Sequence, residues 1–398
     1  MRVVDTEAAV KRLMRFLAVE GVTGREACIG KELAAALKES GVSSRSIRLD
    51  DANTRIPPAT ETGNLIVDVP GRGALKGADR LLFMTHMDTV PLCAGAKPKR
   101  QGKKIINTAN TALGGDNRAG CAVLVTLAAE LARQKLDHPP LTLLFTVREE
   151  SGLWGARHVN PADLGGVTMG FNYDGRSASD VVIGAVGADH WEVEIFGRAS
   201  HAGVAPQRGI SSTMILAEAL SAARHDGWFG KVTKNGHAGT SNVGPVSGAN
   251  GRPAGDATNV VTDYVLVHGE SRSHDAQFVK QITAAYKAAF VRAAAEVTNS
   301  DGKAGRVKFT SRTSYHPFRL KDGVPVVRRA LAAVTAQGRA PNLRAANGGL
   351  DANYLVRHRI PTVTFGAGQN EPHTVDEWID LTEFESGCRL AVELATMR

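Results

Sequence analysis

Short, continuously apolar runs alternate with helix patterns through the first half of the chain, and this alternation limits the possible folds more than any other feature. Runs of this kind are typical of strands that are buried on both faces of a sheet. Strands that alternate with helices predict a mostly parallel, covered sheet. The strand patterns cover residues 63–69, 79–86, 140–147 and 167–174, and the clearest helix pattern covers residues 117–134.

Near Gly187 the pattern changes, because residues 190–198 alternate between apolar and polar like a half-exposed antiparallel strand. A helix pattern, two strand patterns, a long helix pattern and a last strand pattern follow before His316. This β-α-β-β-α-β order is that of a split βαβ sandwich. Helix–strand alternation then returns. We therefore predict an α/β domain formed by residues 1–187 and 317–398, with an inserted α+β domain at residues 188–316.

Length, charge and hydropathy narrow the class of protein. At 398 residues, the chain is longer than a single core usually supports. Its net charge is +8, but the basic residues are scattered, so we expect no nucleic-acid partner. No apolar run is long enough to span a membrane, and residues 1–19 lack a signal-peptide core. We expect no membrane association and a cytoplasmic location.

Polar side chains collect at the predicted ends of the strands and at one helix start. Ligands of open α/β sheets bind beyond the carboxyl ends of the strands, and residues two apart on a strand point to the same side. Singly, each residue has a plainer explanation, such as a helix cap or a surface acid. Together they form the imidazole and carboxylate set that suits a hydrolytic zinc or manganese site. They are His86, Asp88, Asp116, Glu149, Glu150, Asp174 and His373.

Seven motifs resemble, in order and approximate spacing, the cocatalytic dizinc metallopeptidase family. That family contains peptidase T, carnosinase-type dipeptidases, aminoacylase, succinyl-diaminopimelate desuccinylase and carboxypeptidase G. The motifs are THMDTV, GGDNRAG, EESGLWGA, NYDG, RASHAG, GGLDAN and GAGQNEPHTVDEWI. The resemblance implies a zinc-peptidase-like catalytic domain in residues 1–187 and 317–398. It also implies a lid domain in residues 188–316, through which a homodimer forms.

The resemblance assigns five metal ligands. Asp116 is expected to bridge two Zn²⁺ ions, for which Mn²⁺ or Co²⁺ can substitute, and to precede a cis peptide bond with Asn117. His86 and Asp174 would complete one metal site, and Glu150 and His373 the other. Two dications about 3.5 Å apart repel each other, so a shared anion is needed, and the pair can polarise a carbonyl while it holds hydroxide.

The resemblance also assigns catalytic and substrate-binding roles. Glu149 would be the general base that takes a proton from the bridging water, and Asp88 would orient His86. His201 in the lid would stabilise the tetrahedral oxyanion, from the neighbouring subunit in dimeric members. Asn259 and Arg272 would hold a substrate carboxylate, for which the planar guanidinium is well suited.

Two glycines complete the substrate-binding residues. Gly348 and Gly349 would let the backbone approach the substrate closely. The metal ligands fall in the outer segments, whereas His201, Asn259 and Arg272 fall in the insertion. We therefore expect that neither domain holds a complete site.

The activity that the resemblance favours is hydrolysis of short peptides. Asp174 is the acid found in aminopeptidase and dipeptidase members, and GESRSHD resembles peptidase T in particular. We predict a zinc-dependent tripeptide aminopeptidase. Two alternatives stay open: an amidohydrolase, deacylase or carboxypeptidase of the same family, and a metal-stabilised binding protein without catalysis. The intact Glu149 argues against the second alternative, because an inactive relative needs no base.

Overall fold

The computed structural model describes residues 3–255 and 257–398 of the chain. These residues form two compact units, Met1–Ala185 with Arg319–Arg398, and Val186–Phe318. The boundaries expected from the sequence lie two residues from these limits. Each unit has a hydrophobic core of its own, so each is described separately.

The first unit is built on a nine-stranded sheet. Its central strands β6, β3, β7 and β16 run parallel, and β2 and β1 add antiparallel pairs at one edge. The mostly parallel sheet predicted from the sequence is therefore confirmed. In sheet order the strands are β1 (Ile47–Leu49), β2 (Leu65–Val69), β6 (Leu141–Thr146), β3 (Leu81–His86), β7 (Met169–Tyr173), β16 (Thr362–Phe365), β8 (Asp180–Ala185) and β14 (Phe318–Arg319), with β15 (Asn342–Ala346) paired to β8.

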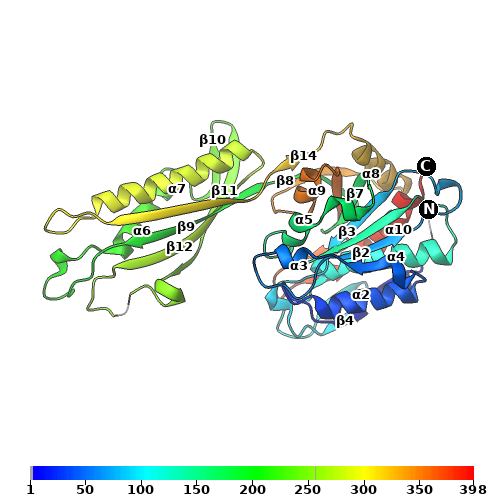
Figure 1. The fold of residues 1–398 in the computed structure, drawn as a ribbon, viewed down its shortest axis with the longest axis horizontal. Helices are drawn as coiled ribbons and strands as arrows, with labels where there is room; N and C mark the ends of the chain where they lie inside the picture. Colours follow the sequence, from blue (N-terminus) through cyan, green and yellow to red (C-terminus); the bar gives the residue numbers. More distant parts are fainter. Residues whose placement is uncertain (1–2, 256) are drawn as a thin grey trace. The chain divides into compact units, whose positions relative to one another are not determined.

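Helix α4 (Gly115–Arg133) lies against β3 and is nearly all buried. A helix that is apolar on all sides must be covered on all sides. The helices that pack on α4 are α1 (Thr6–Leu17), α2 (Ala27–Glu39) and α10 (Leu381–Thr396), while α8 (Pro325–Ala336) packs against β8 and β16 (Figure 1). Every residue of β3 and β6 is buried, as the continuous apolar runs predict.

A small antiparallel sheet and three short helices lie beside this framework. The sheet contains β17 (Gln369–Asn370), β18 (Trp378–Asp380), β5 (Lys104–Asn107) and β4 (Pro98–Gln101), in that order. The short helices are α3 (Ala52–Arg55), α5 (Trp154–His158) and α9 (Ala352–Arg357). The loop between β17 and β18 contains His373, so this small sheet helps to place one of the predicted metal ligands.

The second unit is a five-stranded antiparallel sheet with two helices. Helices α6 (Ser212–His225) and α7 (Ala276–Glu296) contact each other and cover one face of the sheet (Figure 1). In sheet order the strands are β10 (Gly230–Lys234), β11 (His237–Ser247), β12 (Tyr264–Ser273), β9 (Gly187–Phe196) and β13 (Arg306–Tyr315). Strand β9 alternates buried and half-exposed residues, as its sequence predicts.

The predicted β-α-β-β-α-β order of this unit is wrong by one strand, because β10 precedes β11. These strands form a hairpin whose turn residues, Asn235 and Gly236, have φ values of 50° and 81°. An Asn-Gly pair with positive φ at both positions is a strong hairpin signal. The strand was missed because its sequence is polar and only Val232 is buried.

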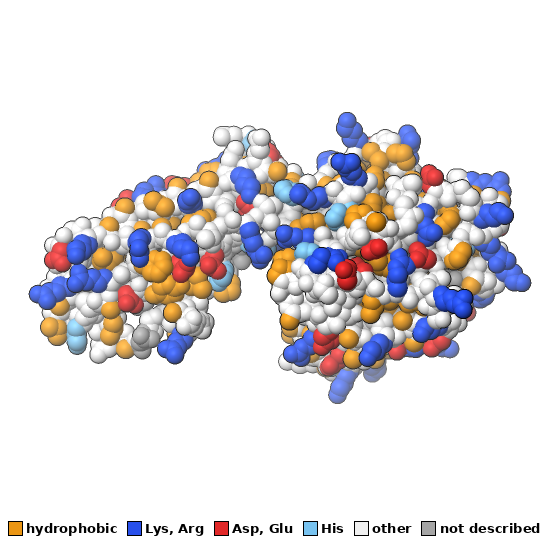
Figure 2. All heavy atoms as spheres, in the orientation of Figure 1, with side chains coloured by type: hydrophobic (Ala, Val, Ile, Leu, Met, Phe, Trp, Pro, Cys, Tyr) orange, Lys and Arg blue, Asp and Glu red, His pale blue; other side chains and the backbone are white. Residues whose placement is uncertain are grey.

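Among the described helices, none is long and apolar enough to cross a membrane. Figure 2 shows Lys and Arg side chains dispersed over the visible face, among acidic and apolar ones. The excess of positive charge is thus spread out on this face.

Candidate metal centre

Five predicted ligands form two groups that share one residue. The first group contains His86, Asp116 and Asp174, and the second contains Asp116, Glu150 and His373. Within each group, one nitrogen or oxygen atom from each residue lies within 4.8 Å of the others. The structure thus brings together all five residues, although they are up to 287 positions apart in the chain (373 − 86).

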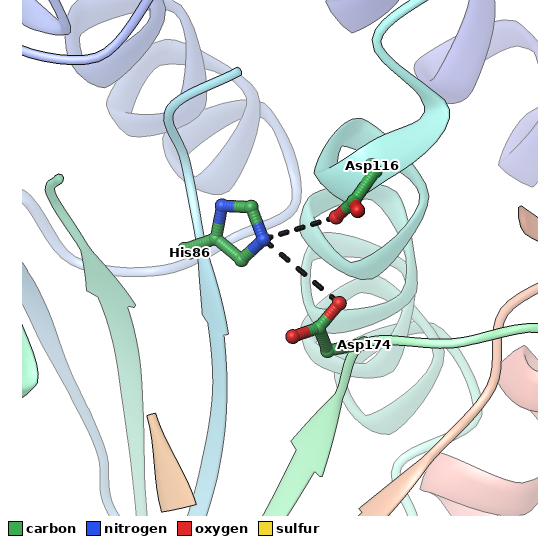
Figure 3. A group of neighbouring side chains, drawn as sticks. All are labelled: His86, Asp116 and Asp174. Carbon is green, nitrogen blue, oxygen red and sulfur yellow. Dashed lines mark hydrogen bonds and ion pairs between the residues drawn. The ribbon is translucent and has the colours of Figure 1, made fainter. Parts of the chain in front are cut away.

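The first group is built at the carboxyl ends of two neighbouring parallel strands. His86 is the last residue of β3, and Asp174 follows β7 directly. Asp116 is contributed by the start of α4 (Figure 3). The Nε2 atom of His86 lies 3.1 Å from Asp116 Oδ1 and 3.9 Å from Asp174 Oδ1. His86 is 1% exposed, so its position is fixed by packing.

The second group meets the other oxygen of Asp116. The Nε2 atom of His373 lies 3.4 Å from Asp116 Oδ2 and 3.0 Å from both carboxylate oxygens of Glu150. One oxygen of Asp116 therefore faces His86 and the other faces His373. A carboxylate in this position can bridge two cations, as the sequence predicts.

A buried glutamate that the sequence analysis did not single out fixes the turn at Asp116. Glu377 is 2% exposed; its Oε2 accepts a hydrogen bond from Gly114 N at 2.7 Å and its Oε1 one from Asp116 N at 2.9 Å. Gly114 has a φ of 80°, a left-handed conformation that glycine adopts without strain. The expected cis peptide bond between Asp116 and Asn117 is present. Glu377 lies within the seventh motif, four residues after His373, and this position is the sequence signal that could have pointed to it.

Asp88 supports both the histidine and the glutamate pair. Its Oδ1 lies 3.3 Å from His86 Nδ1, on the ring side opposite the two carboxylates of the first group. The same carboxylate accepts hydrogen bonds from Glu149 N at 3.0 Å and from Glu150 N at 3.2 Å. The sequence predicts the first contact; the two contacts with the glutamate backbone were not foreseen. Asp88 is fully buried, so each of these contacts is shielded from water.

The acidic side chains of the centre repel one another. Burial raises the pKa of Glu150 to about 7, and it raises the pKa values of Glu149 and Asp174 well above their usual range. The charge of Asp116 adds to the shifts of Glu150 and Asp174. Crowded, buried carboxylates of this kind favour either a bound proton or a bound cation.

The pKa values of the two histidines and of Asp116 are shifted in the directions expected for ion pairs. Hydrogen bonds to Asp116 and Glu150 raise the pKa of His373 to about 10. Burial lowers the pKa of His86, but hydrogen bonds to Asp116 and Asp88 outweigh burial and leave it well above its usual value. Burial also disfavours the charge of Asp116, yet the two histidines hold its pKa well below its ordinary value.

The donor set fits a pair of divalent cations. Imidazole nitrogens and carboxylate oxygens are the ligands of hydrolytic zinc and manganese sites, and each group supplies three protein ligands, the number typical of catalytic zinc. Asp116, which belongs to both groups, would supply the shared anion that two neighbouring dications need. Glu149 belongs to neither group, so its carboxylate remains available for proton transfer.

The other predicted residue pair of the first unit lies between β15 and α9. Gly348 and Gly349 are both half-buried. A Cβ atom added at Gly348 would meet no atom of the described residues within 4 Å. Packing within the protein therefore does not require glycine at this position.

The remaining predicted residues lie in the second unit. His201 is exposed, and its Nδ1 accepts hydrogen bonds from Gly203 N at 3.1 Å and Val204 N at 3.2 Å. These bonds leave the proton on Nε2, so the imidazole can donate a hydrogen bond while it is neutral. Asn259 is also exposed, and its backbone carbonyl accepts a hydrogen bond from Ala202 N at 2.8 Å.

Arg272 is part of an ion pair that the sequence analysis did not foresee. Its Nη2 donates to Glu270 Oε2 at 2.8 Å. The two residues are two positions apart on β12, and this spacing places their side chains on the same face of the sheet. Burial raises the pKa of Glu270, but hydrogen bonds from His190 and Arg272 lower it to about 2. A substrate carboxylate would therefore compete with Glu270 for the guanidinium.

Comparisons with known proteins agree with the fold and place the chain in a family. Residues 82–397 match the model of the peptidase family M20/M25/M40. The crystal structure of aminopeptidase PepT from Bacillus cereus has 30% identity and a TM-score of 0.82, covering 99% of this chain and 98% of that one. A tripeptidase from Staphylococcus aureus has 25% identity and a TM-score of 0.86, covering 99% of both chains. The Bacillus subtilis protein YqjE is 29% identical over 395 residues, which are 98% of each chain.

Fold and relatives together define a peptidase, which is a hydrolase. The chain belongs to peptidase family M20/M25/M40. The family resemblance inferred from the seven motifs is thereby confirmed.

Proposed function

We propose that this protein is a two-metal aminopeptidase that removes the N-terminal residue from short peptides, above all tripeptides. The observation that carries the proposal is the position of Asp116, whose two carboxylate oxygens face His86 and His373 in separate groups. The similarity to an aminopeptidase and to a tripeptidase supports the choice of substrate class.

The residues that would hold the two cations are those of the two groups. His86 and Asp174 would bind one cation, Glu150 and His373 would bind the other, and Asp116 would bind both. When bound, such a pair supplies Lewis-acid polarisation of a carbonyl and a lowered pKa of a water molecule. Zn²⁺ is the ion that we propose, with Mn²⁺ or Co²⁺ as substitutes.

Glu149 is proposed as the general base. Its side chain is 8% exposed, its backbone N–H is held by Asp88, and it lies outside both ligand groups. Burial raises the pKa of Glu149 above its usual range. A carboxylate whose pKa is nearer to neutral is a better proton acceptor at neutral pH.

The second unit is proposed to recognise the substrate. The Nε2–H group of His201 is a suitable donor to a developing oxyanion, because the two bonds at Nδ1 fix its tautomer. Arg272, with Asn259, would bind the C-terminal carboxylate of the peptide, displacing Glu270 from the guanidinium. A homodimer through residues 188–316 is part of the same proposal.

A substrate panel tests the proposal. The zinc-loaded and manganese-loaded proteins would be assayed with free tripeptides, N-blocked tripeptides and N-acyl amino acids. We expect release of the N-terminal residue from free tripeptides only. Cleavage of N-acyl amino acids would instead show a deacylase, and release of the C-terminal residue from N-blocked tripeptides would show a carboxypeptidase. A Glu149→Gln variant with the same metal content controls for contaminating peptidases.

A further inference from the structure

Glu26 is a fully buried carboxylate that lies before α2, outside the residues that match the family model. Its Oε1 accepts hydrogen bonds from Gly24 N at 2.7 Å and from Arg148 N at 3.1 Å. Its Oε2 has no hydrogen-bond partner within the part of the chain that the structure describes. A buried carboxylate is costly, so its presence calls for a reason.

Glu26 and Asp88 together bind three successive backbone N–H groups. Arg148 N donates to Glu26, and Glu149 N and Glu150 N donate to the two oxygens of Asp88. These three residues follow β6 and carry the proposed base and one proposed ligand. The loop is therefore held through its backbone by two buried carboxyl groups that come from distant parts of the chain.

The first residue of this loop has an unusual conformation. Arg148 has a φ of 52°, which is uncommon for a residue with a side chain. Its guanidinium donates to Thr60 Oγ1 at 2.7 Å, to Ser151 Oγ at 3.3 Å and to the carbonyl of Ala59. The hydrogen bond to Glu26 adds a constraint on its backbone. Loss of the hydrogen bond to Arg148 N would free the backbone dihedral angles of Arg148. The residues that follow would then change direction, because these angles set the course of the chain.

We propose that Glu26 is a positioning residue for the active site: through Arg148 N it fixes the loop that carries Glu149 and Glu150. The part of this inference that concerns turnover rests on the proposed function. The alternative is that Glu26 only stabilises the fold, through Gly24 and the start of α2.

Among the described residues, hydrogen bonds reach only one oxygen of Glu26. A neutral side chain with one acceptor oxygen can therefore replace the hydrogen-bonding role of Glu26 without its charge. Burial, together with the nearby charge of Asp88, raises the pKa of Glu26 to about 7. A glutamine at this position keeps an acceptor oxygen and removes the repulsion with Asp88. Glu26→Gln should therefore preserve the loop, whereas Glu26→Ala should release it. Glu26→Asp withdraws the acceptor by one methylene and disturbs the site less than alanine does.

Two readouts test the inference. Hydrogen exchange would be measured on the metal-free protein, at the amides of residues 148–153. The kcat and KM for a tripeptide would be measured on the zinc-loaded protein. Glu130→Ala is the matched control, because Glu130 is a 1% exposed carboxylate that accepts a hydrogen bond from Asp5 N at 2.9 Å. It lies on α4 about 21 Å along the helix from Asp116.

We expect Glu26→Ala to accelerate exchange at residues 148–153 and to lower kcat by about 10–100-fold, with KM near that of the parent. Glu26→Gln should match the parent in both readouts, Glu26→Asp should lie between, and Glu130→Ala should change neither. If the Glu26→Ala variant does not fold, the Glu26→Asp variant is compared with the parent in its place.

Unchanged exchange at residues 148–153 in the alanine or aspartate variant would overturn the inference, and so would an equal effect of Glu130→Ala. If the parent protein cleaves no peptide, the proposed function fails, but the exchange experiment still decides whether Glu26 holds the loop. The two failures can therefore be told apart.

Discussion

Replacing Glu149 with glutamine removes the proposed base without changing the volume of the side chain. Because Glu149 is outside both ligand groups, the substitution leaves every proposed ligand atom in place. It also removes a charge that faces Asp174 and Glu150 in a buried site. We therefore expect zinc content and thermal stability to stay at or above those of the parent.

We expect the Glu149→Gln variant to lose kcat and to keep its bound zinc. Proton transfer by a positioned carboxylate contributes about 10²–10⁴-fold to the rate, which corresponds to about 3–5 kcal/mol of activation free energy. The assay measures kcat for a tripeptide, together with the zinc content of the same sample by mass spectrometry. Glu150→Gln is the control, and it should lose bound zinc because Glu150 is a proposed ligand.

The opposite pattern would refute this assignment. If Glu149→Gln lost one zinc ion along with its activity while Glu150→Gln kept both ions, the roles of the two glutamates would have to be exchanged. A Glu149→Gln variant that kept the zinc and turned over at the parent rate would remove Glu149 from the mechanism.

Three further predictions follow from named contacts. Asp88→Asn leaves a single acceptor oxygen for two backbone N–H groups. It should weaken zinc binding by about 10–100-fold in a chelator competition, and a zinc affinity equal to that of the parent would contradict the supporting role of Asp88. Arg272→Ala should cost about 2–4 kcal/mol in kcat/KM on tripeptides with a free C-terminus and much less on amidated ones, and an equal loss on both would exclude carboxylate binding. The folded-state pKa values of Glu26 and Glu150 are about 7, above their ordinary 4.5. Protonation of these two groups therefore stabilises the folded protein fully below pH 4.5, and this contribution to the free energy of unfolding is lost as the pH rises through 7. Calorimetry should therefore show the melting temperature of the metal-free protein falling over that window, and that of the zinc-loaded protein falling less, because bound zinc would keep Glu150 ionised while Glu26 still titrates. A flat metal-free profile would contradict the charge crowding.

The central sheet could be predicted because its signals are local, and the residues of the two candidate ligand groups were found through the short motifs that contain them. The apolar run that ends in His86 marks a buried strand, and the motif around Asp116 is compact. Strand β10 also had a local signal, the turn at Asn235 and Gly236, but the polar residues of the strand concealed it.

The supporting contacts of the site could not be predicted, because they join distant positions through the backbone. Glu26 binds Arg148 N across 122 positions, and Glu377 binds Gly114 N across 263. A sequence pattern shows that a carboxylate is present, but it does not show which backbone N–H group folding brings to it. Such contacts depend on the packing of several elements at once, so they appear only in the folded structure.

Anomalous diffraction from zinc-loaded crystals, recorded at the zinc absorption edge, tests the central claim most directly. We expect two peaks about 3.5–4 Å apart, one among His86, Asp116 and Asp174 and the other among Asp116, Glu150 and His373. A single peak, or two peaks that do not share Asp116, would contradict the two-metal site on which the proposed function depends.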